Sequence, residues 1–376
     1  MKDYKQFKKN LIIAIVIVVV AVASGIYIGS QDSRNAINKA IFRNETSQDE
    51  CPQIVLENAK NSSIYAYGNK IAILEGNNLN IYNQEGKKEK SIEVALNQPK
   101  AAIAGNYLLL GDSNGSNVYL IQNTDLKWSK TIDGHVSIAS VNTAGIAGIS
   151  VSDTTYKSVI IMYDYNGKEL FKYFLSKTTV TSLDISNDGK YLSFVEVETP
   201  GMSVVSRVKT ISVDKAKKEP ENAIMHTYET KDNVLIIAIR HDEEKVVVFK
   251  DNGIYICKNG NEEKLTDLPE NSGFAGIDLK DHCYKLDENS NGRNSIITIF
   301  NTDNKSGRTY EIEDAVINIS TMKDMLAINV GSKVLFINSG ARPVKRYLTN
   351  ENISKILLGD SIAAIIYNDT ISIVKI

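Results

Sequence analysis

The feature that most constrains the fold of this chain is a repeat of about forty residues that runs through most of its length. Each copy contains a short β-rich run, such as NLNIYNQEG or NVYLIQNTD, that ends in a polar residue and a turn. The polar residues that follow these runs are 37 to 50 positions apart: Asn83, Asn123, Asp164, Asp214, Lys258, Asn301, Asn338 and Lys375. A period of this length is typical of architectures in which each unit buries its apolar face only against its neighbours.

Each copy also holds further strand-like segments around that run. Segments such as KIAILEG and KYLSFVE precede it, a third apolar run such as VTSLDIS lies before these, and segments such as ELFKYFL follow. Four strands per copy, without a long segment of helical period, predict an all-β fold. We expect an eight-bladed β-propeller, or a seven-bladed one if one copy is misread. A β-sandwich is the other all-β alternative, but it would not require a repeat.

The two ends of the repeat complement each other. The eighth copy ends at Ile376, after its third strand, and so lacks a fourth. Residues 53–57, QIVLE, form an apolar run before the first copy. We expect this run to supply the missing strand, because pairing of the two ends would remove an exposed sheet edge.

An uninterrupted apolar segment near the N-terminus is the second strong feature. Residues 11–28 read LIIAIVIVVVAVASGIYI and carry no charge. As an α-helix this segment is roughly 27 Å long, enough to cross the hydrocarbon core of a bilayer. The residues expected to anchor the chain in the membrane are Leu11, Ile12, Ile15, Val18, Val22, Ile26 and Ile28.

The charges that flank the apolar segment predict its orientation. Four lysines precede it: Lys2, Lys5, Lys8 and Lys9. Basic residues concentrate on the cytoplasmic side of membrane helices, so the N-terminus is expected in the cytoplasm. The predicted organisation is a cytoplasmic tail (1–10), a transmembrane helix (11–29), a juxtamembrane spacer (30–50) and an extracytoplasmic propeller (51–376).

A cleaved signal peptide is the alternative interpretation of the same segment. Ala21-Val22-Ala23 is an A-x-A sequence that a signal peptidase could cut. We favour a retained anchor, because the apolar character continues through Ile28 instead of ending before the cut. In both cases the body is exported, and the predicted location is the cell membrane, with one span and the main domain outside the cytoplasm.

The charge balance argues against nucleic acid as a partner. The first 30 residues hold four Lys and one Asp, which leaves 39 basic and 44 acidic residues out of the totals of 43 and 45. The body is thus mildly acidic and shows no Lys/Arg stripe, whereas phosphate binding requires concentrated positive charge. The expected partner is instead an envelope protein or a cell-wall component, beside the membrane itself.

Only one segment resembles a metal site. Asp287, Asn289 and Asn291 alternate before a glycine as in the first half of a calcium-binding loop. The second half departs from that pattern, because Thr298 occupies the twelfth position, where a bidentate Glu is required. The sequence therefore favours a polar hairpin loop, with a calcium site as the alternative. Its three cysteines form no CxxC pair, which predicts neither a zinc site nor a disulfide framework.

The search for catalytic motifs identifies no catalytic residue. Residues 111–115, GDSNG, match the nucleophile elbow G-x-S-x-G, but a strand follows them where a helix is required. Four histidines are scattered over different copies of the repeat, and no glycine-rich loop opens a helix. The sequence predicts no cofactor and no enzymatic activity.

One copy of the repeat resembles a known hallmark. Its segment VTSLDISNDGKYLSFV is similar to the Ser-x-Asp-Gly-Lys-x-Leu-x-Phe pattern of WD40-like and TolB-like propellers, carried by Ser186, Asp188, Gly189, Lys190, Leu192 and Phe194. The Asn-Asp-Gly triplet forms a tight turn between two alternating strands. As a whole the chain resembles an uncharacterised Gram-positive bacterial family of single-pass membrane-anchored propellers with degenerate WD40-like, TolB-like or PQQ-like repeats. This resemblance implies a fold and a location but no activity.

These observations together predict a non-catalytic scaffold of the cell envelope that binds a protein or another ligand. Two alternatives remain open at this point. The first is a propeller enzyme, similar to a quinone dehydrogenase or acting as a hydrolase or lyase. The second is an exported sensor domain that signals through a membrane partner.

Overall fold

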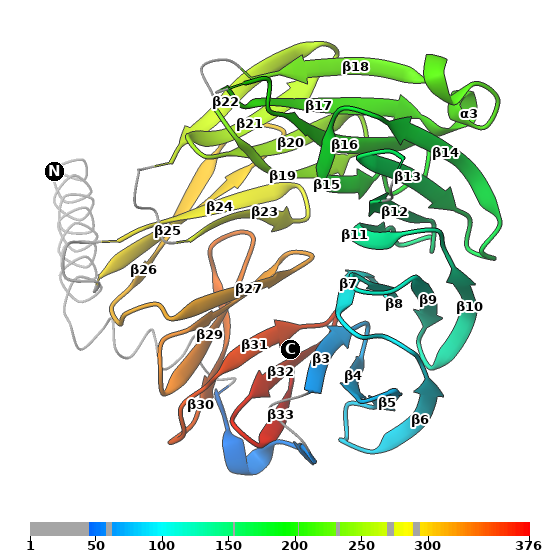
Figure 1. The fold of residues 1–376 in the computed structure, drawn as a ribbon. Helices are drawn as coiled ribbons and strands as arrows, with labels where there is room; N and C mark the ends of the chain where they lie inside the picture. Colours follow the sequence, from blue (N-terminus) through cyan, green and yellow to red (C-terminus); the bar gives the residue numbers. More distant parts are fainter. Residues whose placement is uncertain are drawn as a thin grey trace, which may run out of the picture.

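A computed structural model describes residues 45–57, 62–152, 155–201, 203–230, 234–268, 274–288 and 294–376. Eight β-sheets stand around a central axis as the blades of a closed propeller (Figure 1). The prediction of an all-β, eight-bladed propeller is confirmed, and the seven-bladed alternative is wrong. Each blade is an antiparallel meander whose first strand lies at the axis.

The first four blades follow one another along the chain. Blade 1 consists of β3 (Ser62–Tyr67), β4 (Lys70–Glu75), β5 (Asn78–Tyr82) and β6 (Lys88–Glu93). Blade 2 consists of β7 (Pro99–Ala104), β8 (Tyr107–Asp112), β9 (Asn117–Gln122) and β10 (Asp125–Thr131). Blade 3 consists of β11 (His135–Val141), β12 (Ala147–Ser152), β13 (Ser158–Tyr163) and β14 (Glu169–Leu175). Blade 4 consists of β15 (Thr179–Ile185), β16 (Tyr191–Glu198), β17 (Val205–Ser212) and β18 (Ile224–Glu229), with the short helices α3 (Val213–Ala216) and η3 (Pro220–Asn222) inserted before β18.

The other four blades complete the ring. Blade 5 consists of β19 (Ile236–Asp242), β20 (Lys245–Lys250), β21 (Gly253–Lys258) and β22 (Asn261–Asp267). Blade 6 consists of β23 (Ala275–Leu279), β24 (His282–Asp287), β25 (Ser295–Asn301) and β26 (Gly307–Ile312). Blade 7 consists of β27 (Asn318–Met322), β28 (Met325–Asn329), β29 (Lys333–Asn338) and β30 (Pro343–Leu348), and it gains β1 (Glu45–Ser47). Blade 8 consists of β31 (Lys355–Leu358), β32 (Ile362–Ile366), β33 (Thr370–Lys375) and β2 (Gln53–Val55), and η1 (Gln48–Glu50) connects β1 to β2.

The core consists of layers between adjacent blades. Along β8, Leu108 and Leu110 pack into the layer shared with blade 1, whereas Leu109 packs into the layer shared with blade 3. This division follows from the period of two, which directs successive side chains to opposite faces of a sheet. Every residue of β8 is therefore buried. A blade with two apolar faces is stable only between two neighbours.

The ring is closed by strands from both ends of the chain, as predicted. β2 pairs with β33 in antiparallel register, with Gln53 opposite Ser372 and Ile54 opposite Ile371. Ile54 is only 4% exposed and lies in the apolar layer between blades 8 and 1. This pairing completes blade 8 and removes the open edge of β33.

The structure differs from the predicted spacer (30–50) at its C-terminal end. β1 adds to the outer edge of β30 in parallel orientation, and Glu45 forms a 3.6 Å ion pair with Arg346. Gln48 donates a 2.7 Å hydrogen bond to Glu351 and accepts one of 2.6 Å from Thr349. A strand of only three residues on the outer edge of a sheet shows no alternation of apolar and polar residues. The sequence therefore did not indicate this strand.

The predicted tail (1–10), transmembrane helix (11–29) and most of the spacer lie outside the described residues. None of the helices that the structure does describe has the length and apolar character needed to cross a bilayer.

Two neighbouring residues of β2 test the closure of the ring. Ile54→Asp places a carboxylate in a buried apolar layer and is expected to lower the free energy of unfolding by about 3 kcal/mol. Val55→Asp, at a position that is 73% exposed, should change it by no more than about 0.5 kcal/mol. Chemical denaturation of the detergent-solubilised full chain measures both. Equal effects of the two substitutions would mean that β2 does not close the ring.

Candidate functional site: the central channel and a groove between blades

The first strand of each blade has one hydrogen-bonding edge that faces the axis and pairs with no other strand. These edges surround a central channel with a cavity of about 650 Å³, lined by residues of β7, β11, β15, β19, β23, β27 and β31. Backbone N–H and C=O groups left without partners in such a place are costly. The ring of inner strands therefore needs other groups to satisfy them.

Side chains from neighbouring inner strands satisfy several of these groups. Ser182 Oγ accepts the N–H of Ile239 at 3.2 Å, and Ser320 Oγ accepts the N–H of Leu358 at 3.3 Å. Lys100 Nζ donates to the carbonyl oxygen of Ser137 at 2.6 Å. Each of these bonds joins one blade to the next, so polar residues of the inner strands link the ring around the channel.

Asp184 links three blades. Its Oδ2 accepts the backbone N–H of His241 at 2.7 Å, and its Oδ1 accepts the hydroxyl of Ser140 at 3.2 Å. Protein surrounds this carboxyl group, and burial raises its pKa to about 6, although its hydrogen bonds and the charge of Arg240 oppose the shift. The carboxyl group is therefore ionised at neutral pH, and its burial in the charged form lowers the free energy of unfolding.

Arg240 lies beside Asp184 in the same cavity and contacts blade 6. Its Nη1 donates to the carbonyl oxygens of Ile277 and His282. Its Nη2 lies 3.7 Å from Asp242 Oδ2 and makes no hydrogen bond among the described residues. Burial lowers the pKa of Arg240, and the nearby carboxylates partly oppose this shift.

Asp278, on β23, is the third charged residue of this part of the cavity. Its side chain is exposed to the channel, but the protein around the channel raises the pKa of its carboxyl group by desolvation, and the charge of Arg240 counteracts this effect. Asp184, Arg240 and Asp278 occur near the ends of β15, β19 and β23. No sequence pattern indicates this cluster, because the three residues are far apart in the chain and share no motif.

A Ser–His pair next to the channel is structural. His241 Nδ1 lies 2.7 Å from Ser193 Oγ, and the imidazole stacks on Tyr191 with ring centroids 5.6 Å apart. Burial lowers the pKa of His241, which favours the neutral imidazole. The geometry resembles a nucleophile and its base, but Ser193 is completely buried and no substrate can reach its hydroxyl.

The hallmark residues form the turn between β15 and β16. Ser186 Oγ donates to Asp188 Oδ1 at 2.7 Å, and Asp188 Oδ1 also accepts the N–H of Lys190 at 3.0 Å. Gly189 has a φ of +70°, the left-handed conformation that favours glycine. These residues shape a hairpin and do not converge with the charged residues of the channel.

The other motifs also fall in hairpins. Asp112, within the GDSNG segment, accepts the backbone N–H groups of Asn97 and Gln98, which precede β7, and of Asn114, between β8 and β9. These bonds lower the pKa of Asp112 in spite of partial burial. The segment thus caps a turn.

The structure tests the calcium site only in part. Asp287 ends β24 and forms a 3.2 Å ion pair with Lys285, whereas Asn289 and Asn291 lie outside the described residues. Within the described ranges, no group of three His, Cys, Asp or Glu side chains could hold a metal ion.

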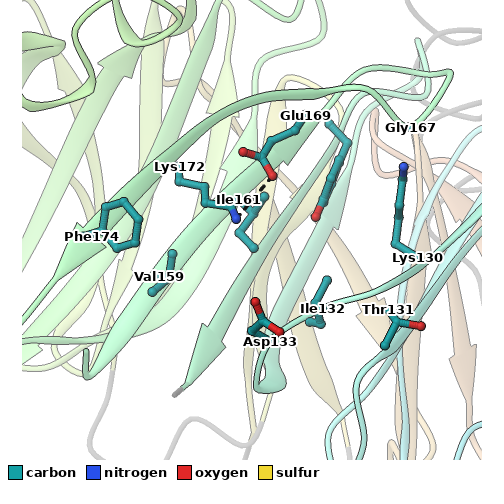
Figure 2. A pocket seen from close by; sticks show the side chains of 11 residues that line it. Lys130, Thr131, Ile132, Asp133, Val159, Ile161, Gly167, Glu169, Lys172 and Phe174 are labelled. Atoms are coloured by element: carbon teal, nitrogen blue, oxygen red, sulfur yellow. Dashed lines mark ion pairs between the residues drawn. The ribbon is translucent and has the colours of Figure 1, made fainter. Parts of the chain in front are cut away.

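A second candidate site is a groove of about 320 Å³ between blades 2 and 3 (Figure 2). Its lining includes the apolar residues Ile132, Val159 and Ile161, and Phe174 lies at its side with 52% of its surface exposed. Lys172 and Glu169, at the same groove, form a 3.4 Å ion pair. The groove thus combines an apolar base with a charged rim.

The only tryptophan of the chain supports this groove from behind. Trp128 packs against Tyr163, which lines the groove, with ring centroids 5.5 Å apart and the ring planes tilted by 46°. A Cβ at Gly167 would lie 2.7 Å from the indole, and Gly167 has a φ of +79°. Glycine is therefore required at this position for both its size and its backbone conformation.

The fold defines the class of this protein, a closed eight-bladed β-propeller. The chain belongs to the family of unknown function DUF5711, whose model matches residues 42–376. Among curated proteins no match is found. Gram-positive origin and membrane anchoring, which the resemblance implied, remain expectations.

Solved structures of other propellers are similar to this one. BamB from Moraxella catarrhalis has a TM-score of 0.51 at 10% identity, and the match covers 86% of this chain and 98% of that one. Sqt1 from Chaetomium thermophilum, bound to the N-terminus of ribosomal protein L10, has a TM-score of 0.53 at 12% identity, with 86% and 99% covered. At such identities the likeness establishes the fold alone.

The raised pKa of Asp184 makes a prediction for stability. Asp184→Asn can retain both hydrogen bonds, because Ser140 can accept where it now donates. The pKa of Asp184 is about 6 in the folded protein and 3.8 in the free group. Between these values the folded protein binds a proton that the unfolded chain has lost. The free energy of unfolding of the wild type should therefore fall, relative to that of the variant, as pH rises from 4 to 6. The loss should reach about 3 kcal/mol at most. Urea denaturation at several pH values measures it.

Asp188→Asn serves as the control of opposite sign. The pKa of Asp188 is lowered by its hydrogen bonds with Lys190 and Ser186, so wild-type protein should lose stability relative to this variant as pH falls. If the free energy of unfolding varied with pH in the same way for Asp184→Asn and wild type, ionisation of Asp184 would not destabilise the folded protein.

Proposed function

We propose that this protein is a membrane-anchored, extracytoplasmic scaffold that binds a partner protein and catalyses no reaction. The observation that carries the proposal is the groove between blades 2 and 3, an open site on the closed ring that is lined by both charged and apolar residues. Such a site on a rigid framework suits recognition.

The occupant that fits the groove best is an extended segment of a partner protein. Other segments of this chain already cover two blade junctions. The helices α3 and η3 bury Ala216 and Ala223 against blade 3, and Cys51 packs on the layer between blades 7 and 8. The groove between blades 2 and 3 has no such cover among the described residues.

Strand pairing offers such a segment a second contact. β1 demonstrates that an outer strand of a blade accepts a short parallel strand. β10 is the outer strand of blade 2, with Leu126, Ser129 and Lys130 exposed. A partner strand along β10 would gain main-chain hydrogen bonds and could place an apolar side chain on Phe174. The similar propeller Sqt1 provides a precedent, since it binds the N-terminus of ribosomal protein L10.

The insertion in blade 4 is a weaker candidate for partner binding. The sequence places residues 196–203 and 215–223 in the longest copy of the repeat, and inserted loops on a rigid scaffold are expected to bind partners. In the structure Ala216 and Ala223 are completely buried. This insertion therefore contributes to the core of blades 3 and 4.

Location and anchoring rest on the sequence. The apolar segment 11–28 and the lysines before it support a single span with a cytoplasmic N-terminus. A propeller carried by such a span would face the cell envelope, and its partner would be an envelope protein or a cell-wall component.

Two exposed apolar residues provide a matched test of the groove. Phe174→Glu should reduce capture of the crosslinked partner from native membranes by about tenfold, because a carboxylate would replace the apolar contact. Ile296→Glu introduces the same group on β25 of blade 6, at a residue that is 38% exposed and does not line the groove, and capture should change less than about twofold. Quantitative mass spectrometry of the crosslinked material measures both variants. Equal capture by wild type and Phe174→Glu would contradict the proposal.

Exposure of the body to protease tests the proposed topology. In intact cells whose outer layers have been made permeable, protease added outside should degrade the propeller and leave an N-terminal fragment of the membrane span. Antibodies against residues 1–10 and against the body distinguish the fragments on a blot. A protected propeller that becomes accessible only after membrane lysis would place the body in the cytoplasm.

A further inference from the structure

The N-terminal segment of this chain demonstrates how the outer side of a blade junction can be covered. β1 adds to β30 in parallel orientation, η1 follows it, and Cys51 then packs on the layer between blades 7 and 8. Gln48 fixes this turn through its hydrogen bonds with Thr349 and Glu351. A short parallel strand followed by a turn is therefore one way to occupy such a junction.

The outer strand β10 has the same place in blade 2 as β30 has in blade 7. Tyr347 of β30 lies opposite Val334, the second residue of β29. Lys130 of β10 lies opposite Val118, the second residue of β9. Both valines pack into the layer toward the following blade. Lys130 is therefore the counterpart of Tyr347, and it lies on the side of β10 that faces the groove.

This correspondence identifies the position in a bound strand that would contact Lys130. In the N-terminal segment, Thr46 lies opposite Tyr347. A partner strand that pairs with β10 in the register of β1 would place the residue equivalent to Thr46 opposite Lys130. Side chains at opposite positions of neighbouring strands interact directly, and opposite charges are favourable there. The charge of that one residue should therefore affect binding.

The charged residues of the groove favour a carboxylate at this position. Lys130 and Lys172 enter the groove from opposite sides (Figure 2), and Lys130 makes no ion pair among the described residues. The pair of Lys172 with Glu169 is weak and can rearrange, because 39% and 45% of the two side chains are exposed. Asp133 lies beyond the end of β10, in the connection to β11. A carboxylate opposite Lys130 would thus be attracted by both lysines.

We propose that the partner of the groove presents an acidic extended segment, which pairs in parallel with β10 and places an Asp or Glu side chain between Lys130 and Lys172. An apolar residue after this strand would contact Phe174, as Cys51 contacts the junction of blades 7 and 8. This inference rests on the proposed function, because it assigns the chemistry of the segment that the groove binds.

A carbodiimide tests the contact in native membranes that contain the full chain, because it joins a carboxyl group to an amine without a spacer. Mass spectrometry should recover Lys130 in an amide bond with an Asp or Glu of another protein. Lys127 is an exposed lysine of the same strand that does not line the groove. It serves as the control and should give at least about fivefold less of such product.

Variants of the same two lysines measure the effect of charge on capture of the partner with a photoreactive crosslinker, which does not depend on amines. Lys130→Glu should reduce capture by about tenfold, because it replaces attraction of the carboxylate by repulsion. Lys130→Arg retains the charge and should capture the partner within about twofold of wild type. Lys127→Glu should also change capture less than about twofold.

Comparison with Phe174→Glu separates this inference from the proposed function. Reduced capture by Phe174→Glu with normal capture by Lys130→Glu would overturn the acidic segment and leave the groove as a binding site. Normal capture by both variants would overturn both proposals. The acidic segment is also overturned if Lys130→Arg loses as much capture as Lys130→Glu, if Lys130 forms amide bonds only within its own chain, or if Lys127 gives as much product as Lys130.

Discussion

The structure depends on the burial of both faces of every blade. Strands such as β8 and β13 are buried at every position, so no blade can be removed without exposing two apolar layers. An open row of such blades would leave two of those faces in water. Closure of the ring by β2 on β33 is thus the interaction on which the other features depend.

Closure has a second consequence at the axis. It brings the unpaired edges of the inner strands into a narrow channel, where the backbone groups need partners. Side chains such as Ser182, Asp184 and Ser320 meet that need from the neighbouring blade. These polar side chains of the channel therefore stabilise the ring. Asp278 differs from them, because within the described part of the chain it makes no hydrogen bond to a neighbouring blade.

The channel and the groove differ in geometry. The channel is enclosed by inner strands and carries a few charged groups. The groove lies between blades 2 and 3, beside the outer strand β10, and combines Phe174 with an apolar base, which suits an extended chain. The groove can bind such a chain on a rigid ring, since this requires no blade to move.

Periodicity and turn chemistry are local properties, and so they predicted the four-stranded blades and the closing strand, and they favoured eight blades over seven. Apolar runs such as KIAILEG and polar turn residues such as Asn83 and Asn123 are enough to place these elements. The sequence did not reveal β1, because an edge strand of three residues has no pattern of its own. It did not reveal the groove or the cluster of Asp184, Arg240 and Asp278, which come from different blades. Which side chains meet depends on the folded ring, because contacts across it are set by the register and direction of eight sheets, and no local stretch of sequence contains that information.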